Sequence, residues 1–386
     1  MHAKGRHSEE AGALARARRK RRLEKISKPL RAGVSKAKKI PRKNQYTFFV
    51  IFCVVVVVIA VVIMHNSNVR VIEEEIQVVG LPRELEGYTI LHLSDLHAAS
   101  FGENQQMLTR ALTGISYDMV AMTGDMVGKS EKSGPLLALI DALPSNKRIF
   151  LIPGDSDPLP EIESPRLTAT TLGGRILADY ILRAGEYGAT YLDAPRAIKI
   201  GTATIWVSPA WQIGLNIAQT QQALAQQAGL TRLRAAAGDE EAIIELPQLE
   251  YRQAQLLAMA QSAGAMQPND YHIALAHQPP NPQDMRVNID SEASKTFLIS
   301  ADLVLAGHYC GGLWRLPFLG AAIYIPAPGT PRYGWFPSPD MVDGMRSAEG
   351  IHVYTSPGLG NTDAILLPKV RFFNAPSVTL IRLVQG

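Results

Sequence analysis

Polar turns that directly follow apolar segments constrain this chain more than any other feature of its sequence. In the first such segment, 89–93, four of the five residues are apolar or β-branched, namely Thr89, Ile90, Leu91 and Leu93, and the segment runs into Asp95 and His97. A short apolar run that ends in a polar turn is typical of a buried strand. In an open α/β sheet, ligands collect at the ends of strands. The pattern therefore predicts a sheet with a ligand site at one edge.

The same pattern recurs at four later places in the chain. These segments and the polar residues that they present are 118–125 with Asp125, 148–157 with Asp155, 271–277 with His277, and 302–312 with His308 and Cys310. Taken singly, each has a simpler explanation, since Asp125 can cap a turn and His277 can be a satisfied core histidine. Five such ends in series favour a divalent metal site, whose usual ligands are carboxylates, imidazoles and thiolates. His92 and His272 lie inside strands, and we predict structural roles for them.

The first 64 residues differ from the rest of the chain. Residues 1–45 hold 16 Lys/Arg and 3 Asp/Glu, a composition that cannot bury a core and predicts a basic, disordered tail. Residues 46–64 carry no charge and are long enough to span a bilayer. No small-residue cleavage site follows, so a permanent signal anchor is favoured over a signal peptide. The β-branched valines next to a basic tail fit lipid better than a buried core helix.

This organisation predicts a single-pass protein of the cell membrane. The basic tail would stay in the cytoplasm, and residues 65–386 would form a domain outside. The tail could instead bind nucleic acid, but no aromatic residues interleave its charges to stack on bases. A topology signal with weak attraction to anionic lipid is favoured, and no nucleic-acid partner is expected. With two cysteines, one of them Cys53 in the apolar run, a disulfide framework is excluded.

The later sequence predicts the fold class. Strands alternate with helices at 104–115, 135–143 and 176–187, and a hairpin at 197–207 and late strands at 351–355 and 377–384 follow. This order predicts an α/β fold, a two-sheet α/β sandwich with flanking helices that is preceded by one transmembrane helix.

A stretch rich in Ala, Gln and Leu, at about 215–263, interrupts this pattern as a helical insertion. We expect two helices there, broken near Gly229 and Gly238, with Pro247 opening the second. The insertion could form a lid or a membrane-facing rim, although simple packing is the favoured interpretation.

The residues at the five strand ends resemble the motifs of the calcineurin-like metallophosphoesterases. The matching residues are Asp95 and His97, Gly124 and Asp125, Gly154 to Asp157, His277, and Gly307 to Gly312. The resemblance covers about residues 75–386. Leu-Pro-Arg-Glu-Leu-Glu-Gly at 81–87 and Leu-Pro-Phe-Leu-Gly at 316–320 are similar to a membrane-associated branch that includes UDP-diacylglucosamine pyrophosphohydrolases.

The resemblance implies two divalent metal ions that share a bridging carboxylate. Asp125 would bridge them, with Asp95, His97 and Cys310 completing site one and Asp155, His277 and His308 completing site two. Asp125, Asp155 and His277 would be the catalytic residues, and a bridging hydroxide would attack phosphorus. The metals would be zinc, manganese or iron, with zinc favoured beside the Cys310 thiolate.

Three positions depart from the family pattern. Asp155 stands where the family has Asn, Ser156 where it has the His that helps the leaving group, and Cys310 where it has the last His. These changes add negative charge and remove a general acid.

The sequence supports three interpretations of what this chain does. The first is a membrane-anchored, metal-dependent phosphohydrolase that cleaves a phosphoester or pyrophosphate bond in a phosphorylated small molecule or lipid-linked substrate. The second is a degenerate module that binds metal or a phosphorylated ligand without turnover. The third is a nucleic-acid or lipid tether that acts through the basic tail. The three altered positions favour the second interpretation. The first is favoured by the unaltered motif residues Asp95, His97, Asp125, His277 and His308, and the enzyme is the preferred interpretation.

Overall fold

The computed structural model describes residues 42–161, 176–281, 301–316, 318–324, 334–348, 350–362 and 371–386. The chain separates after Ile59 into two compact units, 1–59 and 60–386. Residues 1–41, most of the predicted disordered tail, lie outside the described residues.

A long helix, α2 (Arg42–Ser67), carries the uncharged run 46–64. By length and composition this run can cross a membrane, and none of it is buried against the described protein. The lack of burial argues against a core helix.

The larger unit contains two six-stranded sheets. The first has the order β1-β15-β2-β3-β4-β5, with β2 to β5 parallel and β15 antiparallel to β2. Its strands are β1 (Arg70–Val78), β2 (Thr89–Leu93), β3 (Met119–Thr123), β4 (Arg148–Ile152), β5 (Ala189–Tyr191) and β15 (Ser377–Gln385). β1, which follows the apolar run, is an edge strand of this sheet.

The second sheet has the order β13-β14-β9-β8-β7-β6, with β7, β8, β9 and β14 parallel. Its strands are β6 (Arg196–Ile200), β7 (Ala203–Pro209), β8 (Tyr271–Leu275), β9 (Leu303–Ala306), β13 (Gly344–Ala348) and β14 (Ile351–Thr355). A third, antiparallel sheet of short strands follows β9: β10 (Trp314–Leu316), β11 (Gly320–Tyr324) and β12 (Gly334–Trp335). The sequence analysis missed this small sheet.

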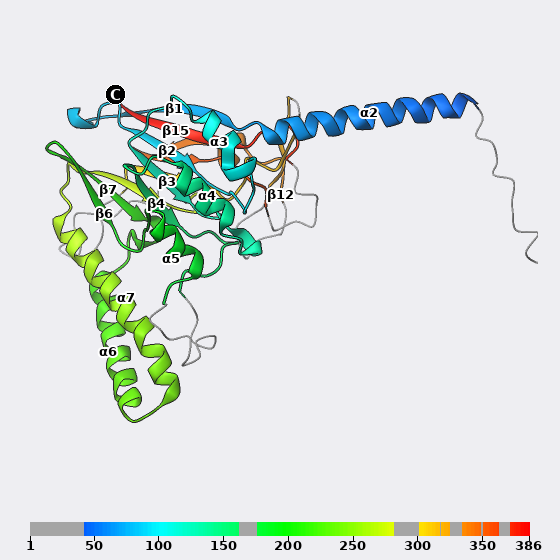
Figure 1. The fold of residues 1–386 in the computed structure, drawn as a ribbon. Helices are drawn as coiled ribbons and strands as arrows, with labels where there is room; N and C mark the ends of the chain where they lie inside the picture. The colour runs from blue at the N-terminus through cyan, green and yellow to red at the C-terminus, as the bar shows by residue number, and fades with distance from the viewer. Residues whose placement is uncertain are drawn as a thin grey trace, which may run out of the picture. The chain divides into compact units, whose positions relative to one another are not determined.

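Two apolar layers hold the sheets and helices together. Between the sheets, side chains such as Ile90 and Phe150 from the first meet Ile273 and Leu305 from the second. On its other face, the first sheet packs against α3 (Gln106–Ala111), α4 (Gly134–Ala142) and α5 (Asp179–Glu186), drawn in front of it in Figure 1. This alternation of side chains between two faces is what a strand buried on both sides requires. The predicted two-sheet α/β sandwich with flanking helices is confirmed.

The insertion forms a helical hairpin of α6 (Ile217–Ala236) and α7 (Glu240–Ala265), which projects from the sheets in Figure 1. The predicted break near Gly238 is confirmed, because Asp239 caps α7 through Ala242 N–H. The predicted break near Gly229 is wrong, since α6 continues through it. Pro247 lies inside α7 and does not open it. A glycine costs a helix only about 1 kcal/mol, which helix–helix packing offsets.

The remaining described helical segments are short. They are η1 (Arg83–Leu85), η2 (Glu103–Gln105), η3 (Gly128–Ser130), η5 (Ala210–Gln212) and α8 (Pro339–Val342).

Candidate metal centre

The carboxyl ends of β2, β3, β4, β8 and β9 meet at one edge of the sandwich. Because these strands are parallel within each sheet, the turns after them lie together. The structure brings together all seven residues that the sequence analysis singled out. Their side-chain donor atoms form three overlapping groups: Asp95, His97 and Cys310; Asp155, His277 and His308; and Asp95, Asp125 and His277.

Asp125 lies at the centre of this cluster. Its Oδ2 is 3.4 Å from His97 Nε2 and 3.4 Å from His277 Nε2. On the second side, Asp155 Oδ2 is 3.1 Å from His308 Nδ1. On the first side, Cys310 Sγ is 4.0 Å from His97 Nε2. One carboxylate therefore touches both halves of the cluster, as a bridging ligand must.

Backbone contacts fix the side chains in place. The N–H of His308 donates to both carboxylate oxygens of Asp95, at 3.1 Å each. The N–H of Ser156 donates to Asp125 Oδ1 at 2.7 Å. His277 Nδ1 lies 2.9 Å from the carbonyl oxygen of Thr123, so Nδ1 carries the proton and Nε2 faces the cluster. A metal-binding histidine is oriented in the same way by a partner behind it.

The backbone of the cluster is strained in a way that favours a functional role. Asp95, His97, Asp125, His308 and Cys310 all have positive φ, between 46° and 77°. Such conformations cost non-glycine residues about 1–3 kcal/mol each and gather at functional sites.

Glycines let the loops approach one another closely. A Cβ at Gly154 would overlap Asp125, and a Cβ at Gly307 would overlap Ser94 and approach Asp95. The donor atoms are therefore held close together by backbone that no larger residue would allow. Three carboxylates, three imidazoles and a thiol in this cradle fit divalent metal ions.

The negative charges of the cluster also favour the binding of a cation. Burial lowers the pKa of His277, but its hydrogen bond to Asp125 and the charges of Asp125, Asp95 and Asp155 outweigh burial and raise this pKa to about 10. Burial alone would raise the pKa of Asp125, yet His277 and His97 hold it below its usual value. Burial and Asp95 raise the pKa of the Cys310 thiol, while Arg371 opposes them.

Two supporting residues, Asp157 and Arg371, lie behind the cluster, and the sequence pattern assigned a role to neither of them. Asp157 accepts hydrogen bonds from four backbone N–H groups, and burial next to Asp125 raises its pKa. The buried Arg371 donates to the carbonyl oxygens of Pro357, Gly360 and Asn374. The position of Asp157, two residues after Asp155, was a local signal. Nothing in the sequence around Arg371 indicates its role.

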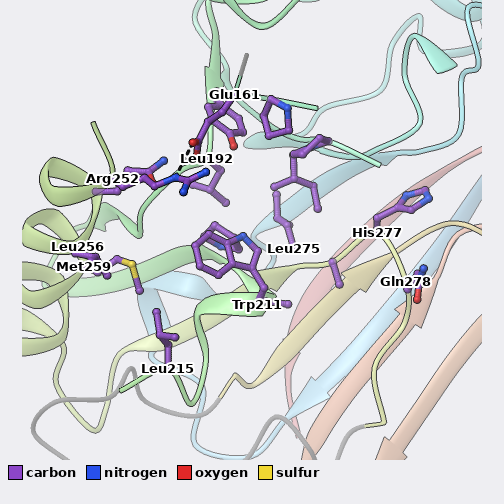
Figure 2. A pocket seen from close by; sticks show the side chains of 18 of the residues that line it. Glu161, Leu192, Trp211, Leu215, Arg252, Leu256, Met259, Leu275, His277 and Gln278 are labelled. Carbon is purple, nitrogen blue, oxygen red and sulfur yellow. Dashed lines mark hydrogen bonds and ion pairs between the residues drawn. The ribbon is translucent and has the colours of Figure 1, made fainter. Parts of the chain in front are cut away.

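The cluster opens on the side of Asp155. The other six residues are buried, whereas Asp155 is exposed and receives a hydrogen bond from Gln278. A pocket of about 780 Å³ begins there, lined by Asp155, His277 and Gln278 and by apolar side chains of β7, β8, α6 and α7. Figure 2 shows His277 and Gln278 on one side of this pocket, the α7 residues on the other, and Trp211 between them. Arg252 is paired there with Glu161 at 2.8 Å.

A two-sheet sandwich whose strand ends gather these ligand types is suited to metal-dependent phosphoester hydrolysis. The family model for calcineurin-like phosphoesterases matches residues 88–311, which include all seven clustered residues. The chain belongs to this family.

A solved structure is similar to this chain in fold comparison, and no curated protein is similar in sequence. A phosphopantetheinyl hydrolase from Mycobacterium tuberculosis is a similar solved structure, with 14% sequence identity and a TM-score of 0.34. The match covers 71% of this chain and 91% of that one. No curated protein matches the chain.

Proposed function

We propose that this protein is a membrane-anchored phosphohydrolase that uses two divalent metal ions to cleave a phosphoester or pyrophosphate bond. The observation that carries the proposal is the place of Asp125, with Oδ2 at 3.4 Å from a histidine of each half of the cluster. Asp95, His97 and Cys310 would hold one ion, and Asp155, His277 and His308 the other. Bound ions would supply positive charge to phosphoryl oxygens and lower the pKa of water.

The chain's own groups prepare the site. Thr123 and Ser156 orient His277 and Asp125 through backbone contacts, so that little reorganisation is needed when substrate arrives. The exposed Asp155 marks the side from which a phosphate would enter. Zinc suits the half with Cys310, since thiolate and imidazole are its preferred ligands.

Ser156 limits which phosphoester or pyrophosphate bonds the enzyme could cleave. Its hydroxyl cannot act as a general acid near neutral pH, so the leaving group receives little proton help. An alkoxide needs that help most, and a phosphate or phenolate needs it least. The enzyme should therefore cleave pyrophosphates and activated aryl esters far better than alkyl phosphates. The same position favours the second candidate, a module that binds metal or a phosphorylated ligand without turnover.

The apolar pocket next to Asp155 supports a lipid-linked substrate. Leu215, Leu224, Leu256 and Met259 line it within reach of the cluster, and apolar walls with few polar groups are typical of sites for hydrophobic ligands. A substrate with a long apolar group next to its phosphate would fit. Such a substrate is consistent with the membrane-associated branch that includes UDP-diacylglucosamine pyrophosphohydrolases.

Metal stoichiometry and substrate screening test the proposal. The purified full-length chain should bind two divalent ions after chelation and reloading, and should hydrolyse aryl phosphate esters or nucleotide-sugar pyrophosphates. If the loaded protein is inert on every substrate and D155N/S156H gains activity, the binding module is correct. Binding of fewer than two ions would contradict the dinuclear site.

Cobalt substitution tests Cys310 without relying on activity. Because Cys310 is fully buried, resistance to alkylation would not show metal binding. A cobalt-loaded protein should instead show a thiolate-to-cobalt absorption band that C310S lacks. The same band in both proteins would exclude Cys310 as a ligand.

A further inference from the structure

Exposed apolar side chains surround the small sheet of β10, β11 and β12. They are Leu316, Phe318, Leu319, Trp335, Phe336 and Phe373, here called the aromatic patch. Phe318 is fully exposed, and Trp335 is 69% exposed. The hairpin between β10 and β11 presents Phe318 and Leu319, and β12 pairs with β11 through Trp335 and Ile323. Large apolar groups in this number on one small element mark an interaction surface.

The end of α2 is joined to this sheet by hydrogen bonds. Asn66 Nδ2 donates to the carbonyl oxygen of Arg371 at 2.7 Å, and the Arg371 N–H donates to Asn66 Oδ1 at 2.9 Å. The next residue, Phe372, accepts a hydrogen bond from the N–H of Arg315 in β10 at 2.8 Å. Residues 371–373 therefore connect the last turn of α2 to the aromatic patch. All these residues belong to the unit that begins at Ala60.

This connection places residues 371–373 next to the end of the apolar run if α2 spans a membrane. Asn66 follows Met64, the last residue of the apolar run, by two positions. At a rise of about 1.5 Å per residue, it lies only about 3 Å beyond the hydrocarbon layer. The headgroup layer begins there, and tryptophan and other aromatic side chains concentrate in it.

Positive φ angles at three phenylalanines of the patch indicate that their rings have a functional role. Phe318, Phe336 and Phe373 have φ of 67°, 49° and 49°. Glycine or asparagine adopts this conformation easily, whereas a bulky residue does so at a cost. If these turns served only to reverse the chain, phenylalanine would be a poor choice at all three.

We propose that the aromatic patch lies in the interfacial layer of the bilayer that α2 crosses. The inference rests on the proposed membrane anchor and adds to it a second contact with lipid. An anchor at one point leaves a domain free to tilt, and a second contact restrains its orientation.

The contact would bring the metal centre close to the lipid headgroups. A pocket of about 390 Å³ is lined by Asn66 from the end of α2, by His97 of the metal cluster, and by Lys132 and Arg371. Asn66, which forms part of the wall of this pocket, therefore lies where the chain would leave the membrane. A domain that rests on the bilayer would hold this pocket near the headgroups on the His97 side of the cluster, whereas the proposed substrate pocket opens on the Asp155 side.

Quenching of tryptophan fluorescence by brominated lipid tests the proposal. The full-length chain, which has four tryptophans, is reconstituted into phosphatidylcholine vesicles with and without brominated acyl chains. We expect brominated lipid to quench the wild type, and W335F to lose most of this quenching. W335F/F336W returns an indole to the patch and should restore it. W335F/Y187W places an indole at another exposed position and should not restore it.

Flotation and quenching together test the membrane anchor and the aromatic patch independently. Flotation of the vesicles after an alkaline wash reports whether α2 is inserted. If the protein does not float with them, the anchor is wrong and the proposal fails with it. If it floats but W335F is quenched as strongly as the wild type, the anchor stands and the proposal is overturned. Shielding of Trp335 from aqueous iodide without quenching by lipid would mean that protein covers the patch, and would overturn it also.

Discussion

The carboxylate of Asp157 holds together two of the loops that carry the metal cluster. It accepts hydrogen bonds from Met126, Val127 and Gly128 after β3, and from Gly154 after β4, at 2.8–3.1 Å. D157N would turn an N–H₂ group towards these donors and leave some of them unsatisfied. We expect it to lower the free energy of unfolding by about 2–4 kcal/mol and to reduce bound metal, measured by urea denaturation and metal analysis.

Asp118 provides a matched control for this change. Its exposed side chain accepts a backbone hydrogen bond from Thr89 at 2.8 Å. D118N should cost less than about 1 kcal/mol and leave metal content unchanged. Equal losses in both variants would contradict the supporting role of Asp157.

A second residue makes stability depend on pH. Burial raises the pKa of Asp302 from 3.8 to about 6, although the N–H of His272 donates to it at 2.7 Å. Between about pH 4 and pH 6 the folded state keeps a proton that the unfolded chain has released, so stability falls as pH rises through this window. D302N cannot ionise and should escape this loss.

Urea denaturation at pH 4 and pH 7 measures the effect. The wild type should lose about 1–3 kcal/mol relative to D302N between the two values. Parallel stability changes in the two proteins would show that Asp302 does not titrate in this range.

At the residue scale, the sequence predicted the seven clustered residues better than it predicted the residues that hold them in place. The seven clustered residues stand directly after apolar strands, so a local pattern exposes them. Arg371 acts through the carbonyl oxygens of Pro357, Gly360 and Asn374, and these contacts depend on loop conformations that no periodicity encodes. For the same reason, the central place of Asp125 came from the resemblance and not from spacing.

At the element scale, the α6–α7 hairpin forms one wall of the apolar pocket. Leu224 of α6 lines the pocket, whereas Leu233 of the same helix is 71% exposed. L224W should narrow the pocket and lower kcat/KM for an aryl phosphodiester with a long alkyl chain by roughly 10-fold. Its methyl counterpart should be affected little, and L233W should leave both rates nearly unchanged. Equal losses on the long-chain and methyl substrates would contradict an apolar substrate site.

The elements themselves were predictable where they are long. Parallel strands of five buried and mostly apolar residues, such as β2 and β8, leave a clear pattern. β12 has two residues and β10 has three, which is too short for any alternation to register. Helix breaks were placed wrongly at Gly229 and Pro247 because local propensity is a weak signal that packing between α6 and α7 overrides.

At the scale of the whole molecule, if α2 spans a membrane, charge should decide which side of that membrane the phosphoesterase domain faces. Lysines and arginines count most within about 15–20 residues of a span. Lys36, Lys38, Lys39, Arg42 and Lys43 lie in that region, whereas Glu73, Glu74 and Glu75 follow on the other side of the apolar run. Protease added to intact cells should therefore digest the C-terminal domain and spare the tail.

Two variants with equal loss of charge separate a positional signal from a general one. K36Q/K38Q/K39Q/R42Q/K43Q removes five charges next to the span and should leave the C-terminal domain partly protected in a mixed orientation. K4Q/R6Q/R16Q/R18Q/R19Q removes five charges farther from the span and should keep the wild-type pattern. If both variants lose orientation equally, net charge and not position acts. If neither does and the domain is protected in the wild type as well, the domain lies in the cytoplasm, and any lipid-linked substrate would have to be presented from the inner leaflet.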